Sequence, residues 1–167
     1  MLDPTIRNVR FKKVLIDGGS ALNLLFVGVL TELGLTKDNL IPVDSPFWGI
    51  VPGRASQPLR QITLPVQFGT TDHFRTEYVN FFVADFDTAY HAILGRLAIT
   101  KFMVVPHYVY LVLKISMEQG VLTLCANVST AYDYEREGLT FAEAMDISAR
   151  MEACIADSKK VHTSSRL

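Results

Sequence analysis

The feature that most constrains this chain is the segment from Val14 to Leu25, in which a short apolar run ends in an acid and two glycines. The residues Val14–Ile16 predict a buried strand, because an unbroken β-branched and leucine run suits a strand covered on both faces. Gly18 and Gly19 permit a tight backbone path that a residue with a β-carbon would resist. Asp17 therefore stands where a charge is costly unless it is shared, hydrogen-bonded or used.

Composition indicates one globular domain with a tail. The chain has 167 residues, of which 49% are hydrophobic and 20% charged, so a sizeable core can be buried. The net charge is -1 and no basic block stands out, which argues against a nucleic-acid partner. Cys125 and Cys154 lack the spacing of a zinc site or a disulfide framework, and they suit a reducing compartment.

The chain shows no sign of export or of a membrane span. Residues 1–4 lack the pattern of a signal peptide. No apolar run approaches the roughly 20 residues that a transmembrane helix needs. We therefore expect an intracellular, cytoplasmic protein with no membrane partner.

Hydrophobic periodicity predicts many short strands and few helices. Strict alternation at residues 62–68 predicts a strand with one buried face. Apolar residues from Leu24 to Leu33 recur at helical spacing before Gly34, which predicts a short helix or a pair of turns. Further strands are expected within residues 5–16, 74–86, 103–115 and 121–126, with a turn at Pro106 and His107 and a short helix at 97–102. About seven or eight strands in this arrangement favour an all-β sandwich or barrel.

Two other segments have a specific character. Phe47–Arg54 is aromatic and punctuated by glycine, which predicts a hairpin with a mobile tip, although an ordinary surface hairpin would have the same pattern. In Tyr90–Arg96, two apolar residues precede a glycine and then a basic residue. From Ser129 onward Glu, Asp, Ala and Met dominate, so we expect a partly helical tail whose end, at 158–167, is disordered.

The pattern from Val14 to Ser20 resembles the active-site segment of retropepsin-like aspartic proteases, in particular those of plant Ty3/gypsy retrotransposon polyproteins. The likeness continues, in the right order, through a segment similar to the flap at 47–53 and the strand that leaves it at 62–66. It ends with a hydrophobic-hydrophobic-glycine element at 92–96. With these four segments in order, the likeness extends over residues 5–127.

The resemblance implies an all-β fold, a closed retropepsin-like β-barrel with one or two short helices, over residues 5–127. Residues 128–167 then form a partly helical or disordered tail or linker. It also implies a homodimer, because aspartic proteolysis needs two carboxylates that share one proton across a water, and this chain has one Asp-x-Gly-Ser segment. We expect the chain to be a fragment of a longer polyprotein, or a decayed copy, located in the cytoplasm or in retroelement particles.

The resemblance also assigns roles to residues. Asp17 is the catalytic acid and base. Gly19 shapes the loop, and Ser20 either donates a hydrogen bond to the Asp17 carboxylate or caps the turn. Gly95 lets its strand approach the loop closely. Gly18 also belongs to the active-site loop. The flap that covers an extended peptide contains Trp48, Gly49, Ile50, Val51 and Gly53. The element beneath the site contains Ile93, Leu94 and Arg96.

Two residues, Gly18 and His91, depart from the family pattern, and His91 stands where an acid or Asn is more common. Gly18 stands where Thr or Ser is most common and where that hydroxyl helps to lock the two loops of the dimer together. Glycine cannot form this bond. Plant retrotransposon members of the family can also carry glycine at this position. The departure at position 18 predicts weaker dimerisation and slower or absent catalysis.

Three classes of function compete for this sequence. The first is an aspartic endopeptidase that processes a retroelement polyprotein. The second is a catalytically silent retropepsin-like module for dimerisation or peptide binding. The third, a nucleotide- or phosphate-binding protein suggested by residues 17–20, fails because no long helix, βαβ unit or phosphate clamp follows. We expect no cofactor and no metal, since the histidines and cysteines have no ligand spacing.

Overall fold

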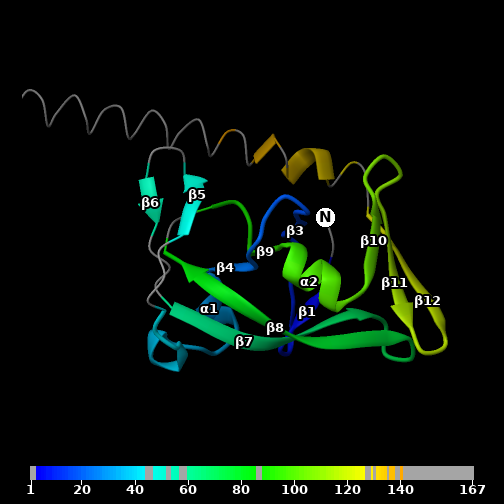
Figure 1. The fold of residues 1–167 in the computed structure, drawn as a ribbon, viewed down its shortest axis with the longest axis horizontal. Coiled ribbons are helices and arrows are strands. Elements are labelled where there is room, and N and C mark those ends of the chain that lie inside the picture. Colours follow the sequence, from blue (N-terminus) through cyan, green and yellow to red (C-terminus); the bar gives the residue numbers. More distant parts are fainter. Residues whose placement is uncertain are drawn as a thin grey trace, which may run out of the picture.

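The computed structural model describes residues 3–43, 47–51, 54–56, 60–85 and 88–126, together with residues 129, 131–134, 136, 137 and 140. Figure 1 shows a curled sheet in the centre of the molecule, a smaller three-stranded sheet at one end and a two-stranded hairpin at the other. Short helices lie against the sheet. None of the helices in the described ranges combines the length and the hydropathy that crossing a membrane requires.

Seven strands form the main sheet, in the order β2-β1-β7-β8-β4-β9-β3. Their bounds are β1 Thr5–Ile6, β2 Val9–Arg10, β3 Val14–Ile16, β4 Leu24–Phe26, β7 Arg60–Gly69, β8 Phe74–Ala84 and β9 Ala92–Leu94. β3 pairs with β9, and β4 with β8, in parallel. Because β9 lies between β3 and β4, the chain that connects these two consecutive strands must pass over the end of β9.

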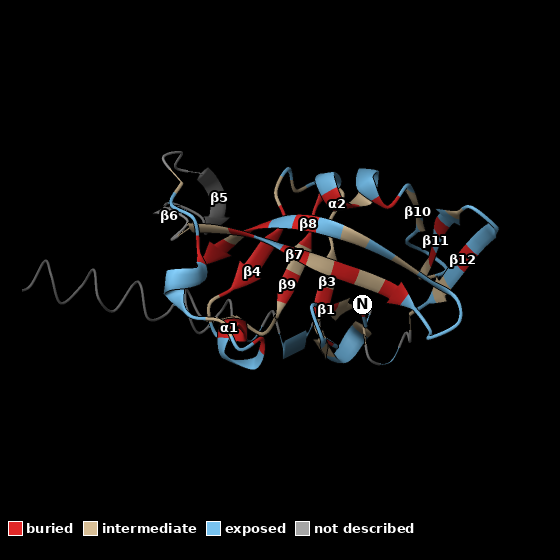
Figure 2. Ribbon diagram, turned by 90° about the horizontal axis from the view of Figure 1, so that it is seen from below, coloured by how far each residue is buried: buried red, intermediate tan, exposed pale blue. Residues whose placement is uncertain are grey.

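The hairpin of β7 and β8 supplies much of the core. Ile62, Leu64, Val66 and Phe68 are buried, so the strand predicted from their alternation is confirmed. Buried residues from β8 face the same core, which Figure 2 shows as red bands along the sheet. These β8 residues are Val79, Phe81 and Val83.

The prediction of a helix or turn pair over Leu24–Leu33 was wrong in its first part. Leu24–Phe26 form β4, and the helix α1 spans only Val29–Glu32. All three β4 residues are buried because the strand lies inside the sheet, between β8 and β9. A fully buried strand is a continuous apolar run, and such a run also satisfies helical spacing. The remaining helices are the 3-10 turn η1 Lys37–Asn39 and the α-helix α2 Arg96–Lys101.

The smaller sheet has the strand order β10-β11-β12, with bounds β10 Val104–His107, β11 Val112–Met117 and β12 Gly120–Cys125. Pro106 and His107 belong to β10, paired with Leu113 and Val112. The turn expected at these two residues therefore lies farther along the chain, between β10 and β11. Residues 103–115 are too apolar throughout for sequence pattern alone to locate that turn.

The main sheet is curled and open in the part of the chain that the structure describes. Its outer strands, β2 and β3, do not pair with each other. The closed barrel expected from the sequence is thus not confirmed, whereas the expectation of a mostly β fold with a few short helices is.

The segment after β12 contacts the domain through Lys13. Its described residues 129, 131–134, 136, 137 and 140 are helical. The Lys13 ammonium forms an ion pair with Glu137, with 2.7 Å between Nζ and Oε2, and lies 5.0 Å from the centre of the Tyr134 ring. The domain boundary at residues 127 and 128 stays a prediction.

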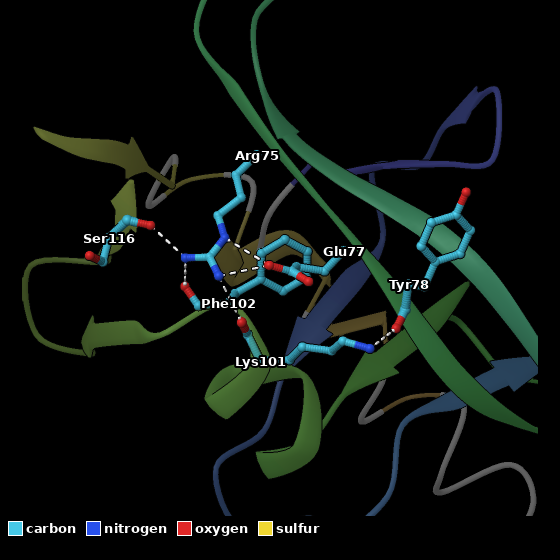
Figure 3. A network of polar contacts seen from close by, with 6 residues as sticks. All are labelled: Arg75, Glu77, Tyr78, Lys101, Phe102 and Ser116. Carbon is cyan, nitrogen blue, oxygen red and sulfur yellow. Dashed lines mark hydrogen bonds and ion pairs between the residues drawn. The ribbon is translucent and has the colours of Figure 1, made fainter. Parts of the chain in front are cut away.

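Arg75 joins the main sheet to the smaller one (Figure 3). From β8, its guanidinium donates to the carbonyl oxygens of Lys101, Phe102 and Ser116 at 2.9, 3.0 and 2.5 Å. Nε and Nη2 also donate to Oε1 of Glu77 at 3.0 and 2.7 Å. Both side chains are largely buried, at 17% and 24% exposed, so the Arg75–Glu77 ion pair is partly shielded from water.

Replacing Arg75 should destabilise the fold substantially. We expect Arg75→Ala to lower the free energy of unfolding by roughly 2–4 kcal/mol, because the variant leaves the Glu77 carboxylate and three carbonyls without their donor. Urea unfolding measures the change. Arg10→Ala is the matched control, since Arg10 is 71% exposed and pairs with Asp3 at 3.8 Å; its effect should stay within about 0.5 kcal/mol. Equal effects of the two variants would contradict this role.

Candidate active site

The position of Asp17 is determined by three neighbouring strands. Asp17 follows β3, and its N–H donates to the carbonyl oxygen of Leu94, the last residue of β9, at 3.0 Å. β4 pairs with β9 from the other side, with Leu24 opposite Ile93. Residues 17–23 therefore form a short bridge from one neighbour of β9 to the other, which we call the crossing loop.

Gly95 makes the crossing possible. A β-carbon at this position would lie 2.2 Å from the carbonyl oxygen of Leu22 and 2.8 Å from that of Ser20, distances that real β-carbons do not adopt. The next residue, Arg96, donates its N–H to the Ser20 oxygen at 2.9 Å. The backbone at the end of β9 is thus in direct contact with the crossing loop, as the sequence led us to expect of Gly95.

Asn23 fastens the end of the crossing loop. It is the buried polar side chain of the described core, at 2% exposed. Its Oδ1 accepts the N–H groups of Gly95 at 3.0 Å and Ala98 at 3.3 Å, and its Nδ2 donates to the Asn80 carbonyl at 3.0 Å. One side chain thus links the loop, the start of α2 and β8. No role was predicted for it from the sequence, where the one available signal is a single amide within an apolar run.

The Asp17 carboxylate lies at the surface of this junction and is partly exposed. Its Oδ1 accepts the N–H of Gly19 at 2.8 Å. A β-carbon at Gly19 would lie 3.1 Å from the same oxygen, so a side chain there would crowd the carboxylate. The rest of the carboxylate is available to a water or to a second acid.

The Ser20 hydroxyl does not donate to Asp17. It donates to the Leu22 carbonyl at 2.9 Å and accepts the Leu22 N–H at 3.2 Å. The Ser20 N–H donates to the Asp17 carbonyl at 3.2 Å. Of the two roles considered for Ser20, the structure supports turn capping, because residues this close in sequence satisfy each other's polar groups locally.

The structure places the other predicted residues as follows. The backbone of β5 Phe47–Val51, which includes Trp48, Gly49, Ile50 and Val51, pairs with β6 Arg54–Ser56 in an antiparallel hairpin. In Figure 1 this hairpin stands on the upper side of the sheet. Gly53 lies outside the described residues. Leu94 is buried, Ile93 is half-buried and Arg96 is exposed.

Two further acids, Asp85 and Asp87, follow β8 in the sequence and lack the glycines that flank Asp17. Asp85 is exposed and pairs with Lys37 at 3.3 Å. Asp87 lies outside the described residues. Within the described residues, no cluster of three His, Cys, Asp or Glu side chains is arranged to hold a metal.

His91 is a half-buried histidine immediately before β9. Its backbone N–H donates to the Lys13 carbonyl oxygen at 2.9 Å. Its imidazole ring packs edge-on against the Phe11 ring, with 5.3 Å between the ring centroids. Nδ1 is buried and has no hydrogen-bond partner among the described groups. Burial lowers the pKa of His91 below 6.5; nearby Glu32 opposes this shift and Lys13 adds to it.

Comparison with known proteins identifies the fold. No family model and no curated protein matches the sequence. Among solved structures, the chain is similar to the retroviral protease-like domain of Ddi1 from Leishmania major, with a TM-score of 0.52 and 19% sequence identity. The match covers 76% of this chain and 94% of that chain. The chain therefore has a retropepsin-like fold, and at this identity the likeness establishes the fold alone.

Replacing Asn23 should loosen the crossing loop. Asn23→Leu leaves the N–H groups of Gly95 and Ala98 buried without an acceptor, so we expect a loss of roughly 2–4 kcal/mol in the free energy of unfolding. Asn8→Leu is the matched control, because Asn8 is exposed in the turn between β1 and β2. Urea unfolding of both variants measures the difference, and a loss at Asn23 no greater than at Asn8 would refute the assignment.

His91 should make stability depend on pH. Because the pKa of His91 is lowered in the folded chain, the unfolded chain takes up a proton more readily as the pH falls below about 6.5, so stability is full above that pH and declines below it. We expect His91→Gln to flatten the decline in unfolding free energy between about pH 7 and pH 5 relative to the unmodified chain. Denaturant unfolding across this range measures the two slopes, which would be identical if His91 had no part.

Proposed function

We propose that this chain is an aspartic endopeptidase that acts as a homodimer, in which two copies of Asp17 activate the water that attacks the peptide bond. The main support for the proposal is the way in which the structure holds Asp17. Its carboxylate stands, partly exposed, on a loop pinned across β9 by the Leu94 and Arg96 contacts. The retropepsin-like fold supports the same reading.

The chemistry requires two carboxylates with different protonation. The ionised one takes a proton from the water as the oxygen attacks the carbonyl carbon, and the protonated one donates to the carbonyl oxygen. The chain contains one Asp-x-Gly-Ser segment. A two-fold axis beside the crossing loop would supply the second carboxylate from a second copy, because a closed symmetric dimer repeats the same surface on both partners.

The substrate in this proposal is an extended peptide. A peptide binds such a site as an added strand, through main-chain hydrogen bonds that are indifferent to most side chains. The β5–β6 hairpin is the element suited to cover it, with Trp48, Ile50 and Val51 facing the peptide in the proposed complex. Resemblance to plant Ty3/gypsy sequences at residues 14–20 and 92–96 favours a retroelement polyprotein as the natural substrate.

A second candidate is a catalytically silent module that retains the fold for dimerisation or peptide binding. Gly18 favours it, because the residue after the acid supplies no hydroxyl to strengthen the contact between the two loops. A single lost hydrogen bond is worth about 1 kcal/mol, which weakens a dimer without abolishing it. This magnitude leads us to prefer the active enzyme.

Asp17→Asn separates the two candidates. The amide cannot act as general base, so we expect cleavage of a peptide library, or of the chain's own flanking sequences, to fall by at least about a hundredfold. Asp85→Asn, at an exposed acid paired with Lys37, is the control and should cleave like the unmodified chain. Cleavage that persists in Asp17→Asn would exclude the protease, and absence of cleavage in every form would favour the silent module.

A further inference from the structure

Tyr108 brings a hydroxyl to the crossing loop from a distant part of the chain. It is the first residue after β10, in the turn that leads to β11. A β-carbon built on Gly18 would lie 3.0 Å from the Tyr108 hydroxyl oxygen. The hydroxyl therefore occupies the space next to Gly18 that a side chain at position 18 would take, one residue from the acid.

The turn that carries Tyr108 has a defined shape. The Tyr110 N–H donates to Nδ1 of His107 at 3.2 Å, and the two rings stack with centroids 4.5 Å apart and planes 18° from parallel. Leu111 adopts a left-handed backbone, with φ of 51°, and its carbonyl accepts the N–H of Ala126 at 2.8 Å. Four residues thus hold the backbone on which Tyr108 stands.

The Tyr108 side chain is open to a second molecule. It is 60% exposed, although its hydroxyl lies against the crossing loop. A phenol can both donate and accept a hydrogen bond. Tyrosines that are partly packed and partly exposed to solvent are common at protein interfaces. In a dimer that brings two Asp17 carboxylates together, a group this close to Gly18 lies near the partner's crossing loop.

We propose that Tyr108 is a positioning residue of the dimeric site, whose hydroxyl hydrogen-bonds the partner's crossing loop and replaces the hydroxyl that Gly18 lacks. The inference rests on the proposed homodimer. The loop has a glycine at position 18 because the phenol fills that space. The two features are therefore coupled, and changing one alters the effect of changing the other.

Tyr108→Phe removes the hydroxyl and keeps the exposed ring. We expect its dimer dissociation constant, measured by sedimentation equilibrium, to rise about tenfold, since two symmetry-related hydrogen bonds are lost. Tyr110→Phe is the matched control, an exposed tyrosine of the same turn whose ring stacks on His107. It should dimerise like the unmodified chain. At a protein concentration low enough for the chain to be monomeric, both variants should unfold at the same urea concentration as the unmodified chain, because neither hydroxyl is part of the core.

The coupling to Gly18 gives the sharper test. Gly18→Ser places a side chain against the Tyr108 hydroxyl and should weaken dimerisation. In the double variant Gly18→Ser with Tyr108→Phe, the serine supplies a hydroxyl and the phenyl ring leaves room for it. We expect the double variant to dimerise more tightly than either single variant, whereas independent residues would give additive losses.

Four results would overturn the proposal. One is an unchanged dissociation constant in Tyr108→Phe, and another is additive losses in the double variant. The third is a raised KM in Tyr108→Phe with unchanged dimerisation, which would make Tyr108 a substrate contact. A chain that is monomeric at every concentration would also overturn it. Sedimentation needs no catalysis, so a dimer with these couplings but no cleavage would fail the proposed function while upholding the role of Tyr108.

Discussion

The contact between the end of β9 and the crossing loop is the constraint on which the rest of the structure depends. Gly95 leaves room for the carbonyl oxygens of Ser20 and Leu22 at a distance that no other residue could accommodate. Asn23 then ties the loop to α2 and to β8 from within the core. A partly exposed acid is in this way mounted on a loop that several backbone and side-chain hydrogen bonds hold in place, as the proposed catalysis requires.

The groups that hold the crossing loop in place are different from the Asp17 carboxylate that the loop exposes. The holding groups are backbone N–H and C=O groups and one buried amide, and they leave the outer face of the loop free. Asp17 uses a single oxygen to accept the Gly19 N–H. Arg75 keeps the smaller sheet attached to the main one, and so keeps the Tyr108 turn beside the loop. The site thus joins three parts of the chain that are far apart in sequence.

The local sequence pattern predicted those parts of the fold in which the type of each residue reflects its own burial. The alternation at 62–68 and the apolar run at Val14–Ile16 both identified strands. The expected burial of Val14–Ile16 on both faces was wrong, because β3 is an edge strand in which Val14 is buried and Leu15 and Ile16 are half-buried. Leu24–Phe26 was misassigned because its strand character comes from pairing with residues 82–84, which lie far along the chain. The sequence left the Ser20 hydroxyl with two possible roles, because both a bond to the Asp17 carboxylate and a cap within the turn involve neighbouring residues. The neighbourhood of Tyr108 and Gly18 depends on how two sheets are docked, and neither segment carries a local sign of it.

The central claim is that one catalytic site contains Asp17 from two chains, and mixing tests it most directly. Unmodified and Asp17→Asn chains are combined in equal amounts, allowed to exchange subunits at constant total protein, and assayed for peptide cleavage. If both carboxylates are needed, activity follows the square of the unmodified fraction and falls to about a quarter. If each chain acts alone, activity follows that fraction linearly and stays at about a half, which would contradict the account.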